Sequence, residues 1–131
     1  MSQENCIFCN ISSGKSDTTL EFETDEFVIF KDIKPASTYH YLIVTKEHYE
    51  SLKVLDKSHT KLVGRMEDTL KEFLKSKDID TTDALFGFHM PPFISVKHLH
   101  LHGIAPRSEM GFFSRLVFKS SAPWFKSVCY P

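Results

Sequence analysis

The apolar and polar positions in the first half of the chain follow the pattern of short strands. Residues 26–31 are mostly β-branched and aromatic, and residues 39–45 form a second run of the same kind. Turn-forming residues at 32–37 join the two runs, and another turn-rich stretch at 12–17 sets off a short N-terminal element. This pattern predicts two strands joined by a turn.

Between residues 58 and 75 the spacing becomes helical. Apolar side chains recur there at steps of one, three and four, which is the stripe of an amphipathic helix, and Asp56 or Ser58 is suited to cap its start. The stripe consists of Leu62, Val63, Met66, Leu70, Phe73 and Leu74. We therefore predict one main helix in this region.

Two further strands are predicted after the helix, at residues 84–89 and 96–104, on either side of a break at Pro91 and Pro92. The order strand, strand, helix, strand, strand predicts an α+β fold with an antiparallel sheet. We expect one domain over residues 1–131.

The core of this domain is expected at about 6–106, followed by a tail at 107–131 whose mixed periodicity fits both a helix and a strand. The apolar side chains of the tail are expected to be buried; they are Phe112, Phe113, Leu116, Val117 and Phe118.

Composition narrows the class of protein. With 41% hydrophobic and 25% charged residues, the chain is able to bury a core and is not of a disordered type. The net charge of -1 disfavours a nucleic-acid partner, which requires a clustered basic surface. No apolar run approaches the roughly 18 residues of a membrane span, and the N-terminus has no signal pattern. We expect no membrane partner and a cytoplasmic location, with the nucleus as a second compartment.

The segment with the clearest chemistry is residues 98–102, His-Leu-His-Leu-His. In a strand, alternate side chains share a face, so the three imidazoles are expected to line a surface or cleft while the leucines face the core. A metal site of all three is awkward, because His98 and His102 would lie roughly 13 Å apart along a strand. The other chemical reading is nucleophilic attack by a neutral imidazole on phosphorus, assisted by its neighbours. The alternative without a chemical role is that the three histidines are solvated on an exposed face of the sheet.

Several spaced motifs give the chain a family resemblance. Residues 98–104, His-Leu-His-Leu-His-Gly-Ile, resemble the signature of the histidine triad superfamily. The resemblance runs from about Cys6 to Trp124 and includes Cys-Ile-Phe-Cys at the start, Phe-Lys-Asp-Ile-Lys-Pro at 30–35 and Lys-Glu-His after the second strand. Within the superfamily, residues 87–93 and the late Trp-Phe pair are similar to the nucleotide-binding (Hint) branch.

The resemblance implies a nucleotide phosphoramidase that cleaves adenosine 5'-monophosphoramidate or a related AMP conjugate. His100 would attack the α-phosphorus to form a covalent intermediate, which water then hydrolyses. His102 would contact the same phosphate and assist proton transfer. His40 matches a further active-site histidine of the family, and Ser95 would hydrogen-bond the phosphate or leaving group. The family also implies no cofactor for catalysis, a purine nucleotide as partner, and a homodimer whose sheet extends across the two copies.

Four residues are implied to bind the nucleotide. Asp32 would bind the ribose hydroxyls, and an Asx turn is a compatible alternative role. Phe30 and Ile33 would sandwich the base, with core packing as the alternative for each. His89 stands where the commonest branch has asparagine, and the glycines that follow there are replaced here by residues 91–93, so leaving-group preference is open.

The Cys6-x-x-Cys9 spacing is that of a zinc knuckle, which needs two more ligands. The resemblance implies that His48 and His98 supply them, giving a structural Zn²⁺ site that is separate from the catalytic histidines. An empty pair and a redox pair are the alternatives.

Two other functions stay open. The first is a nucleotide-binding scaffold with little catalysis. The second is an aprataxin-like deadenylase, which the net charge and the lack of a Cys/His finger after the triad disfavour. The position of Trp124 is also open, either as a core anchor or as a residue that reaches a partner subunit's cleft.

Overall fold

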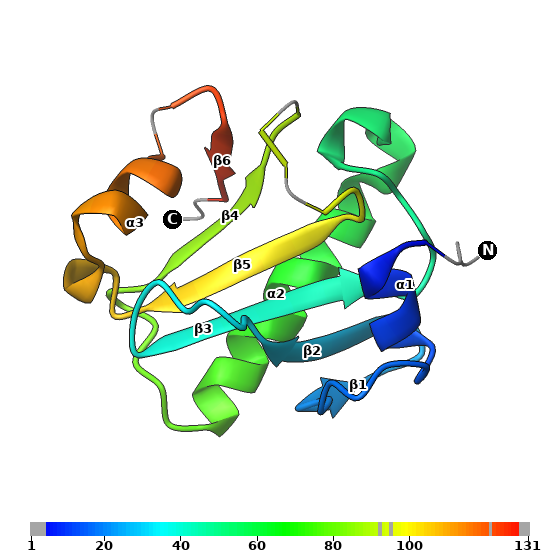
Figure 1. Cartoon of the computed structure of the whole chain (residues 1–131), viewed down its shortest axis with the longest axis horizontal. Coiled ribbons are helices and arrows are strands. Elements are labelled where there is room, and N and C mark those ends of the chain that lie inside the picture. The colour runs from blue at the N-terminus through cyan, green and yellow to red at the C-terminus, as the bar shows by residue number, and fades with distance from the viewer. Residues whose placement is uncertain (1–4, 92, 95, 121, 129–131) are drawn as a thin grey trace.

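The computed structural model describes residues 5–91, 93–94, 96–120 and 122–128 (Figure 1). All its strand pairs are antiparallel, and they form one six-stranded sheet in the order β1-β2-β3-β5-β4-β6. The elements are α1 (Ile7–Ser12), β1 (Phe22–Glu23), β2 (Phe27–Lys31), β3 (Tyr39–Thr45), α2 (Thr60–Ser76), β4 (Leu85–His89), β5 (His100–Ala105), α3 (Phe112–Val117) and β6 (Phe125–Ser127), with 3-10 turns at Leu52–Val54, Lys57–His59 and Arg107–Glu109. The predicted α+β class is confirmed.

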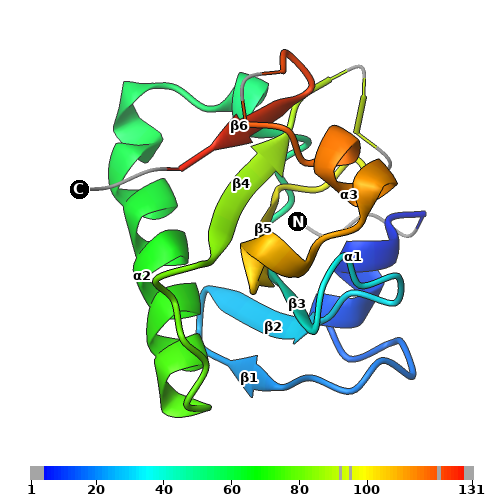
Figure 2. The same cartoon turned by 90° about the vertical axis from the view of Figure 1, so that its left-hand side faces the viewer.

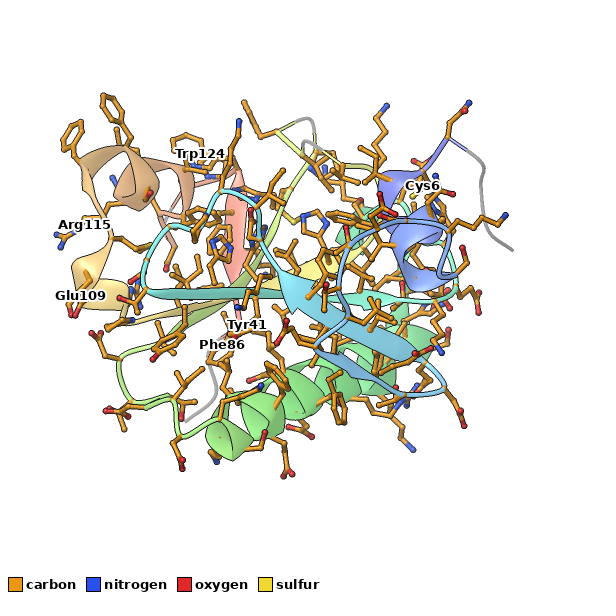
Figure 3. The ribbon with its side chains drawn as sticks, turned by 60° about the horizontal axis from the view of Figure 1, so that its bottom comes forward. Cys6, Tyr41, Phe86, Glu109, Arg115 and Trp124 are labelled. Atoms are coloured by element: carbon orange, nitrogen blue, oxygen red, sulfur yellow. The ribbon has the colours of Figure 1, made fainter. Side chains whose placement is uncertain are left out.

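The helix α2 covers one face of the sheet. Its apolar stripe packs against side chains that point from the strands, including Tyr41 and Phe86, and together they bury the largest core cluster (Figure 3). The predicted helix and three of the predicted strands lie where the periodicity placed them. Asp56 caps the short turn before α2 by accepting the N–H of Ser58.

Two separate covers lie on the other face of the sheet. Figure 2 shows α1 and α3 on the side opposite α2. The helix α1 buries Phe8 and Ile11 over β2 and β3, while the chain after β5 buries Phe118 and Phe125 over β4 and β5. The histidine segment lies beneath both covers.

The last predicted strand begins later than the sequence indicated. The prediction of residues 96–104 is wrong in its first part, because β5 starts at His100. The His98 N–H donates to the Val96 carbonyl two residues earlier (2.9 Å), and the Leu99 N–H donates to the Tyr49 carbonyl (2.6 Å). Residues 96–99 therefore form a bend that carries His98 away from the strand.

The tail differs most from its prediction. Of the five apolar side chains expected to be buried, only that of Phe118 is; Phe112 and Phe113 are 72% and 78% exposed. The six-residue α3 buries none of its own residues. It is held instead by hydrogen bonds from side chains to backbone carbonyls in and next to the helix. Arg115 donates to the Met110 carbonyl, and Trp124 donates to the Leu116 carbonyl.

The strand β6 lies along the outer edge of β4. Gly87 pairs with Ser127, and a Cβ at this glycine would collide with the Phe125 ring and the Lys126 carbonyl. Glycine is therefore what allows the C-terminal strand to approach so closely. None of the described helices is both long and apolar enough to cross a bilayer.

Candidate active site and metal centre

Two neighbouring strands bring three histidines to the face of the sheet opposite α2. The register of β3 and β5 sets His40 opposite Ile104 and Leu42 opposite His102. Because side chains alternate along a strand, His40, His100 and His102 share this face.

The sequence predicted that the histidines line a surface or cleft. In the structure they are buried instead. His40, His100 and His102 are only 3%, 5% and 5% exposed. Aromatic rings cover them: the Phe8 ring lies 4.9 Å from that of His100, and the Phe118 ring lies 5.0 Å from that of His102. Burial is tolerated because no buried side-chain nitrogen or oxygen of the described residues lacks a hydrogen-bond partner.

His100 is held as a neutral ring. Its Nδ1 lies 2.6 Å from the His98 carbonyl oxygen. A carbonyl only accepts, so Nδ1 carries the proton and the lone pair is on Nε2. Burial lowers the pKa of His100 to about 4, against the opposing effect of the His98 carbonyl. The ring is therefore neutral at pH 7, the form in which imidazole attacks phosphorus.

His40 and His102 are in direct contact. The His40 Nε2 lies 2.9 Å from the His102 Nδ1, and the Ala36 N–H donates to the His40 Nδ1 at 3.0 Å. Burial lowers the pKa of His40 to about 4, although the Asp32 carboxylate partly offsets it. Burial, together with the neighbouring imidazoles, also holds the pKa of His102 well below its usual range.

Asp32 forms the Asx turn that was one of its two compatible roles, and its carboxylate also contacts the histidine group. Its Oδ1 accepts the Lys34 N–H at 2.8 Å, which is an Asx turn. Its Oδ2 lies 3.4 Å from the His40 Nε2, so the carboxylate also reaches the histidine group. Asp32, His40 and His102 converge closely enough to resemble a metal group, but the hydrogen bond between the two rings already accounts for their closeness.

The two residues expected to bind the base differ in exposure. Ile33 is 90% exposed, so core packing is wrong for this residue. Phe30 is buried and packs edge-on against Phe8, with ring centroids 5.5 Å apart. Phe30 therefore has the core packing that was its alternative role.

His89 reaches the same group from β4. Its Nδ1 lies 3.2 Å from the His102 Nε2, and its Nε2 lies 3.1 Å from the Val117 carbonyl oxygen. Burial lowers its pKa. Beside it is a cavity of about 310 Å³ with a mostly apolar lining of His89, Phe93, Leu116, Val117 and Trp124. Ser95, the remaining predicted catalytic residue, lies outside the described residues.

Trp124 is half-buried within its own chain. Its indole N–H donates to the Leu116 carbonyl at 2.9 Å, and its ring lies near that of Phe93. The side chain thus ties β6 to α3.

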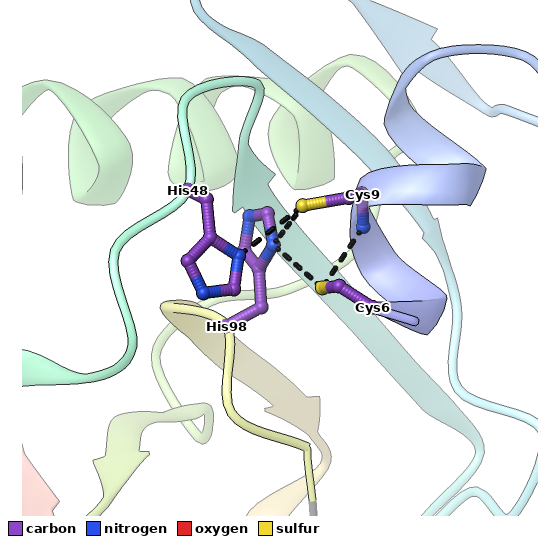
Figure 4. A group of neighbouring side chains, drawn as sticks. All are labelled: Cys6, Cys9, His48 and His98. Carbon is purple, nitrogen blue, oxygen red and sulfur yellow. Dashed lines mark hydrogen bonds between the residues drawn. The ribbon is translucent and has the colours of Figure 1, made fainter. Parts of the chain in front are cut away.

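A second group of polar side chains lies under α1. Cys6, Cys9, His48 and His98 place one ligand atom each within 4.8 Å of one another (Figure 4). The His98 Nδ1 lies 3.2 Å from the Cys6 sulfur and 3.3 Å from the Cys9 sulfur, and the His48 Nδ1 lies 3.2 Å from the Cys9 sulfur. Both cysteines are free thiols.

This group fits a tetrahedral metal ion. Zinc bonds of about 2.3 Å to sulfur and 2.1 Å to nitrogen set ligand atoms roughly 3.4–3.8 Å apart, close to the distances between the sulfurs and nitrogens. The His98 Nε2 lies 2.7 Å from the Thr45 carbonyl oxygen. The proton is therefore on Nε2, and the Nδ1 lone pair faces the two sulfurs. A backbone acceptor of this kind is the usual support of a metal-binding histidine.

The sequence did not single out the aromatic cover. Phe8 stands between the two cysteines and Phe118 follows α3, yet both rings lie against the buried histidines. The high phenylalanine count was the available signal, with 12 in the chain. The Val117 carbonyl has no side-chain signature and could not have been found from sequence.

Comparison with known proteins agrees with this geometry. The family described as "Scavenger mRNA decapping enzyme C-term binding" matches residues 5–117. The chain is 46% identical over 129 residues to the adenosine 5'-monophosphoramidase HINT3 of Mus musculus, covering 96% of this chain and 78% of the relative. It is 40% identical over 102 residues to an Arabidopsis thaliana protein, the bifunctional adenosine 5'-phosphosulfate phosphorylase/adenylylsulfatase HINT4, covering 76% and 69%. A solved histidine triad protein from Clostridium difficile superposes with a TM-score of 0.75 at 31% identity, covering 79% of this chain and 92% of that one.

Proposed function

This chain belongs to the histidine triad superfamily, and we propose that it hydrolyses the phosphorus–nitrogen bond of adenosine 5'-monophosphoramidate or a related AMP conjugate. The observation that carries the proposal is the state of His100: a neutral ring whose Nδ1 proton is held by the His98 carbonyl, leaving the lone pair on Nε2. The names of the mouse and Xenopus tropicalis relatives support the same reaction.

The reaction has two steps. The His100 Nε2 forms a bond to the α-phosphorus, and the phosphorus–nitrogen bond breaks as the amine leaves. His102 supplies the proton that the departing nitrogen needs. The oxygen of a water molecule then bonds to the phosphorus, the bond between phosphorus and the His100 Nε2 breaks, and a proton of the water returns to His102, so that the net products are the free amine and AMP. Ser95 would contact the phosphate or leaving group.

Nucleotide binding requires movement at the site. Because His100 and His102 are 5% exposed, a phosphate reaches them only when the side chains that cover them move. Asp32 would bind the ribose hydroxyls, and the position of its carboxylate beside the histidine group supports this role. The exposed Ile33 is available to the purine base, whereas Phe30 would act from beneath Phe8.

A structural Zn²⁺ is proposed at Cys6, Cys9, His48 and His98, with no cofactor for the chemistry. The ion would tie α1 to the bend before β5. The carbonyl of His98 orients His100, and Phe8, between the two cysteines, packs on the same ring. The ion would thus stabilise the position of the nucleophile without touching the substrate.

A homodimer remains part of the proposal, but its form is constrained. Residues of β6 pair with β4 from Gly87 to His89, so a sheet continued between copies through β4 requires β6 to move aside. Sedimentation of the full chain and of a chain cut after Pro123 tests this: the shortened chain is expected to dimerise more tightly. For location, we propose the cytoplasm, with the nucleus second, which imaging of the tagged chain tests.

Trapping the adduct tests the function. Protein mixed with adenosine 5'-monophosphoramidate and quenched in the cold is expected to carry the mass of AMP on His100. If product forms without an adduct, a substrate with slower hydrolysis of the adduct is used, and a second failure would remove the covalent step. If neither adduct nor product is detected, the protein is a nucleotide-binding module and not a hydrolase of this substrate.

A further inference from the structure

Three imidazoles form a continuous hydrogen-bonded chain across three strands. His40 on β3 contacts His102 on β5 at 2.9 Å, and His102 contacts His89 on β4 at 3.2 Å. A backbone group terminates each end: the Ala36 N–H at His40, and the Val117 carbonyl at His89. Both nitrogens of every ring therefore have a neighbour.

The first end of this chain fixes the position of two protons. The Ala36 N–H only donates, so the His40 Nδ1 accepts and the proton of the neutral ring is on Nε2. This proton points at the His102 Nδ1, with the Asp32 carboxylate as a second acceptor at 3.4 Å. His102 must accept at Nδ1, so its own proton is on Nε2.

The other end gives the same answer independently. The Val117 carbonyl only accepts, so the His89 Nε2 carries the proton and the Nδ1 of a neutral ring holds a lone pair. This lone pair faces the His102 Nε2 at 3.2 Å, which is therefore the nitrogen that must donate. Derived from either end, His102 has the Nε2–H tautomer.

We propose that His89 is a positioning residue that keeps the proton of His102 on Nε2, so that the proton is already in place for the departing amine. This inference rests on the proposed function for its consequence, although the tautomer itself is a property of the resting protein. It gives His89 a role through His102 and not through direct contact with the nucleotide.

The surroundings of the hydrogen-bonded histidines favour the neutral form of His40, His89 and His102. Protonation of His102 would add a proton at Nδ1, which would then face the Nε2–H of His40. Because two donors would meet there, the hydrogen bonding opposes protonation. Burial also lowers the pKa of His40, His89 and His102. The titratable groups that face this chain are His100 from β5 and Asp32 from the turn after β2.

The same geometry links the site to the tail. Val117 is the last residue of α3, and Phe118 directly after it packs against the rings of His40, His89 and His102. The position of α3 therefore determines whether the Val117 carbonyl can accept the hydrogen bond from His89.

Two variants separate the two nitrogens of His89. In His89→Asn, the amide oxygen replaces Nδ1 and accepts from His102, while the contact to Val117 is lost. In His89→Gln, the longer amide reaches Val117, while the acceptor for His102 is lost. We expect kcat to stay within about threefold in the Asn variant. In the Gln variant it should fall by at least about tenfold with little change in KM, within the roughly 10²–10⁴-fold that a positioned acid–base group supplies.

A spectroscopic measurement makes the test independent of turnover. Long-range ¹⁵N–¹H correlation of the imidazoles is expected to report Nε2–H for His102 in the wild type and the Asn variant, and a mixture in the Gln variant. His59→Asn, at an exterior ring, is the matched control and should change neither kcat nor the His102 signals.

The outcomes distinguish this inference from the proposed function. Nδ1–H at His102 in the wild type, or an unchanged tautomer and kcat in His89→Gln, would overturn the positioning role. The expected tautomers in a protein that does not cleave the phosphoramidate would instead overturn the function while leaving the hydrogen-bonded chain intact. Thermal melting of both variants checks that they are folded.

Discussion

The metal group under α1 and the buried histidines of the neighbouring strands are built from the same residue type on the same side of the sheet, but His98 and His100 hold their protons on different ring nitrogens. His98 and His100 are two residues apart. The Thr45 carbonyl draws the proton of His98 to Nε2, whereas the His98 carbonyl draws that of His100 to Nδ1. One backbone acceptor each is enough to leave the lone pair of His98 on Nδ1, facing two sulfurs, and that of His100 on Nε2.

The two groups also differ in what satisfies their lone pairs. In the metal group, the His98 lone pair faces both cysteine sulfurs and the His48 Nδ1 lies 3.2 Å from the Cys9 sulfur, an arrangement that a cation would complete. In the histidine chain, His40, His102 and His89 satisfy one another. A buried histidine is therefore not diagnostic of metal binding; its hydrogen-bond partner is.

The largest expected effect breaks the catalytic side alone. In His100→Asn, the amide N–H still reaches the His98 carbonyl but no nucleophilic nitrogen remains, so kcat should fall by about 10⁴-fold or more. Hydrolysis of adenosine 5'-monophosphoramidate followed by ³¹P NMR measures this. AMP binding and zinc content should be retained. Near-normal turnover would refute attack by His100.

Breaking the metal side should affect stability more than chemistry. Cys9→Ser removes the sulfur that faces both His48 and His98. Bound zinc, measured by elemental analysis, should fall from about one ion per chain to near zero. Tm should drop by about 10 °C, the shift for roughly 3 kcal/mol in a domain of this size.

Cys129→Ser is the matched control for this change, since Cys129 carries no metal-ligand spacing in the sequence. Zinc content that is equally low in the wild type, purified without chelator, would contradict the site. Equal zinc in wild type and Cys9→Ser would contradict the assignment of its ligands.

Acid should act through the histidine chain. The pKa of His40 is lowered to about 4 by burial, whereas an unfolded histidine titrates near 6.5. Between these values the unfolded chain binds more protons, so stability is fully present above pH 6.5 and is lost as pH falls toward 4. His40 alone should cost about 2 kcal/mol between pH 7 and pH 5.

Urea unfolding at the two pH values measures this loss. His40→Gln should show a smaller difference in unfolding free energy between pH 7 and pH 5 than the wild type. His59→Gln, at a histidine outside the buried group, should show the wild-type difference. If the difference in unfolding free energy between pH 7 and pH 5 is the same in all three proteins, His40 is not held neutral.

Much of this architecture was predictable from the sequence, for identifiable reasons. Runs of β-branched and aromatic residues located β2, β3 and β4, which are buried on both faces of the sheet, and helical spacing located α2, which buries one apolar stripe. Cys6 and Cys9 could be paired by their spacing, but the bend that delivers His98 to them could not, since it depends on backbone hydrogen bonds to Val96 and Tyr49.

The tail escaped prediction because its apolar residues do not all face the core. Phe118 is buried, whereas Phe112 and Phe113 are exposed, and nothing in their spacing separates them. The position of α3 is set by donors to backbone carbonyls, such as Trp124 to Leu116. Such contacts leave no trace in hydrophobic periodicity.

The smallest expected effect compares two glycines and asks how firmly the tail holds the histidine chain. In Gly87→Ala, the added methyl collides with Phe125, whose ring packs on His89 and His102, so unfolding free energy should fall by about 1–3 kcal/mol and kcat should change with it. In Gly64→Ala, within α2, the methyl meets nothing within 4 Å. That change should stabilise the chain by up to about 1 kcal/mol and leave kcat and zinc content unchanged. Equal effects of the two changes on kcat would mean that the close approach of β6 to β4 does not hold the catalytic histidines in place.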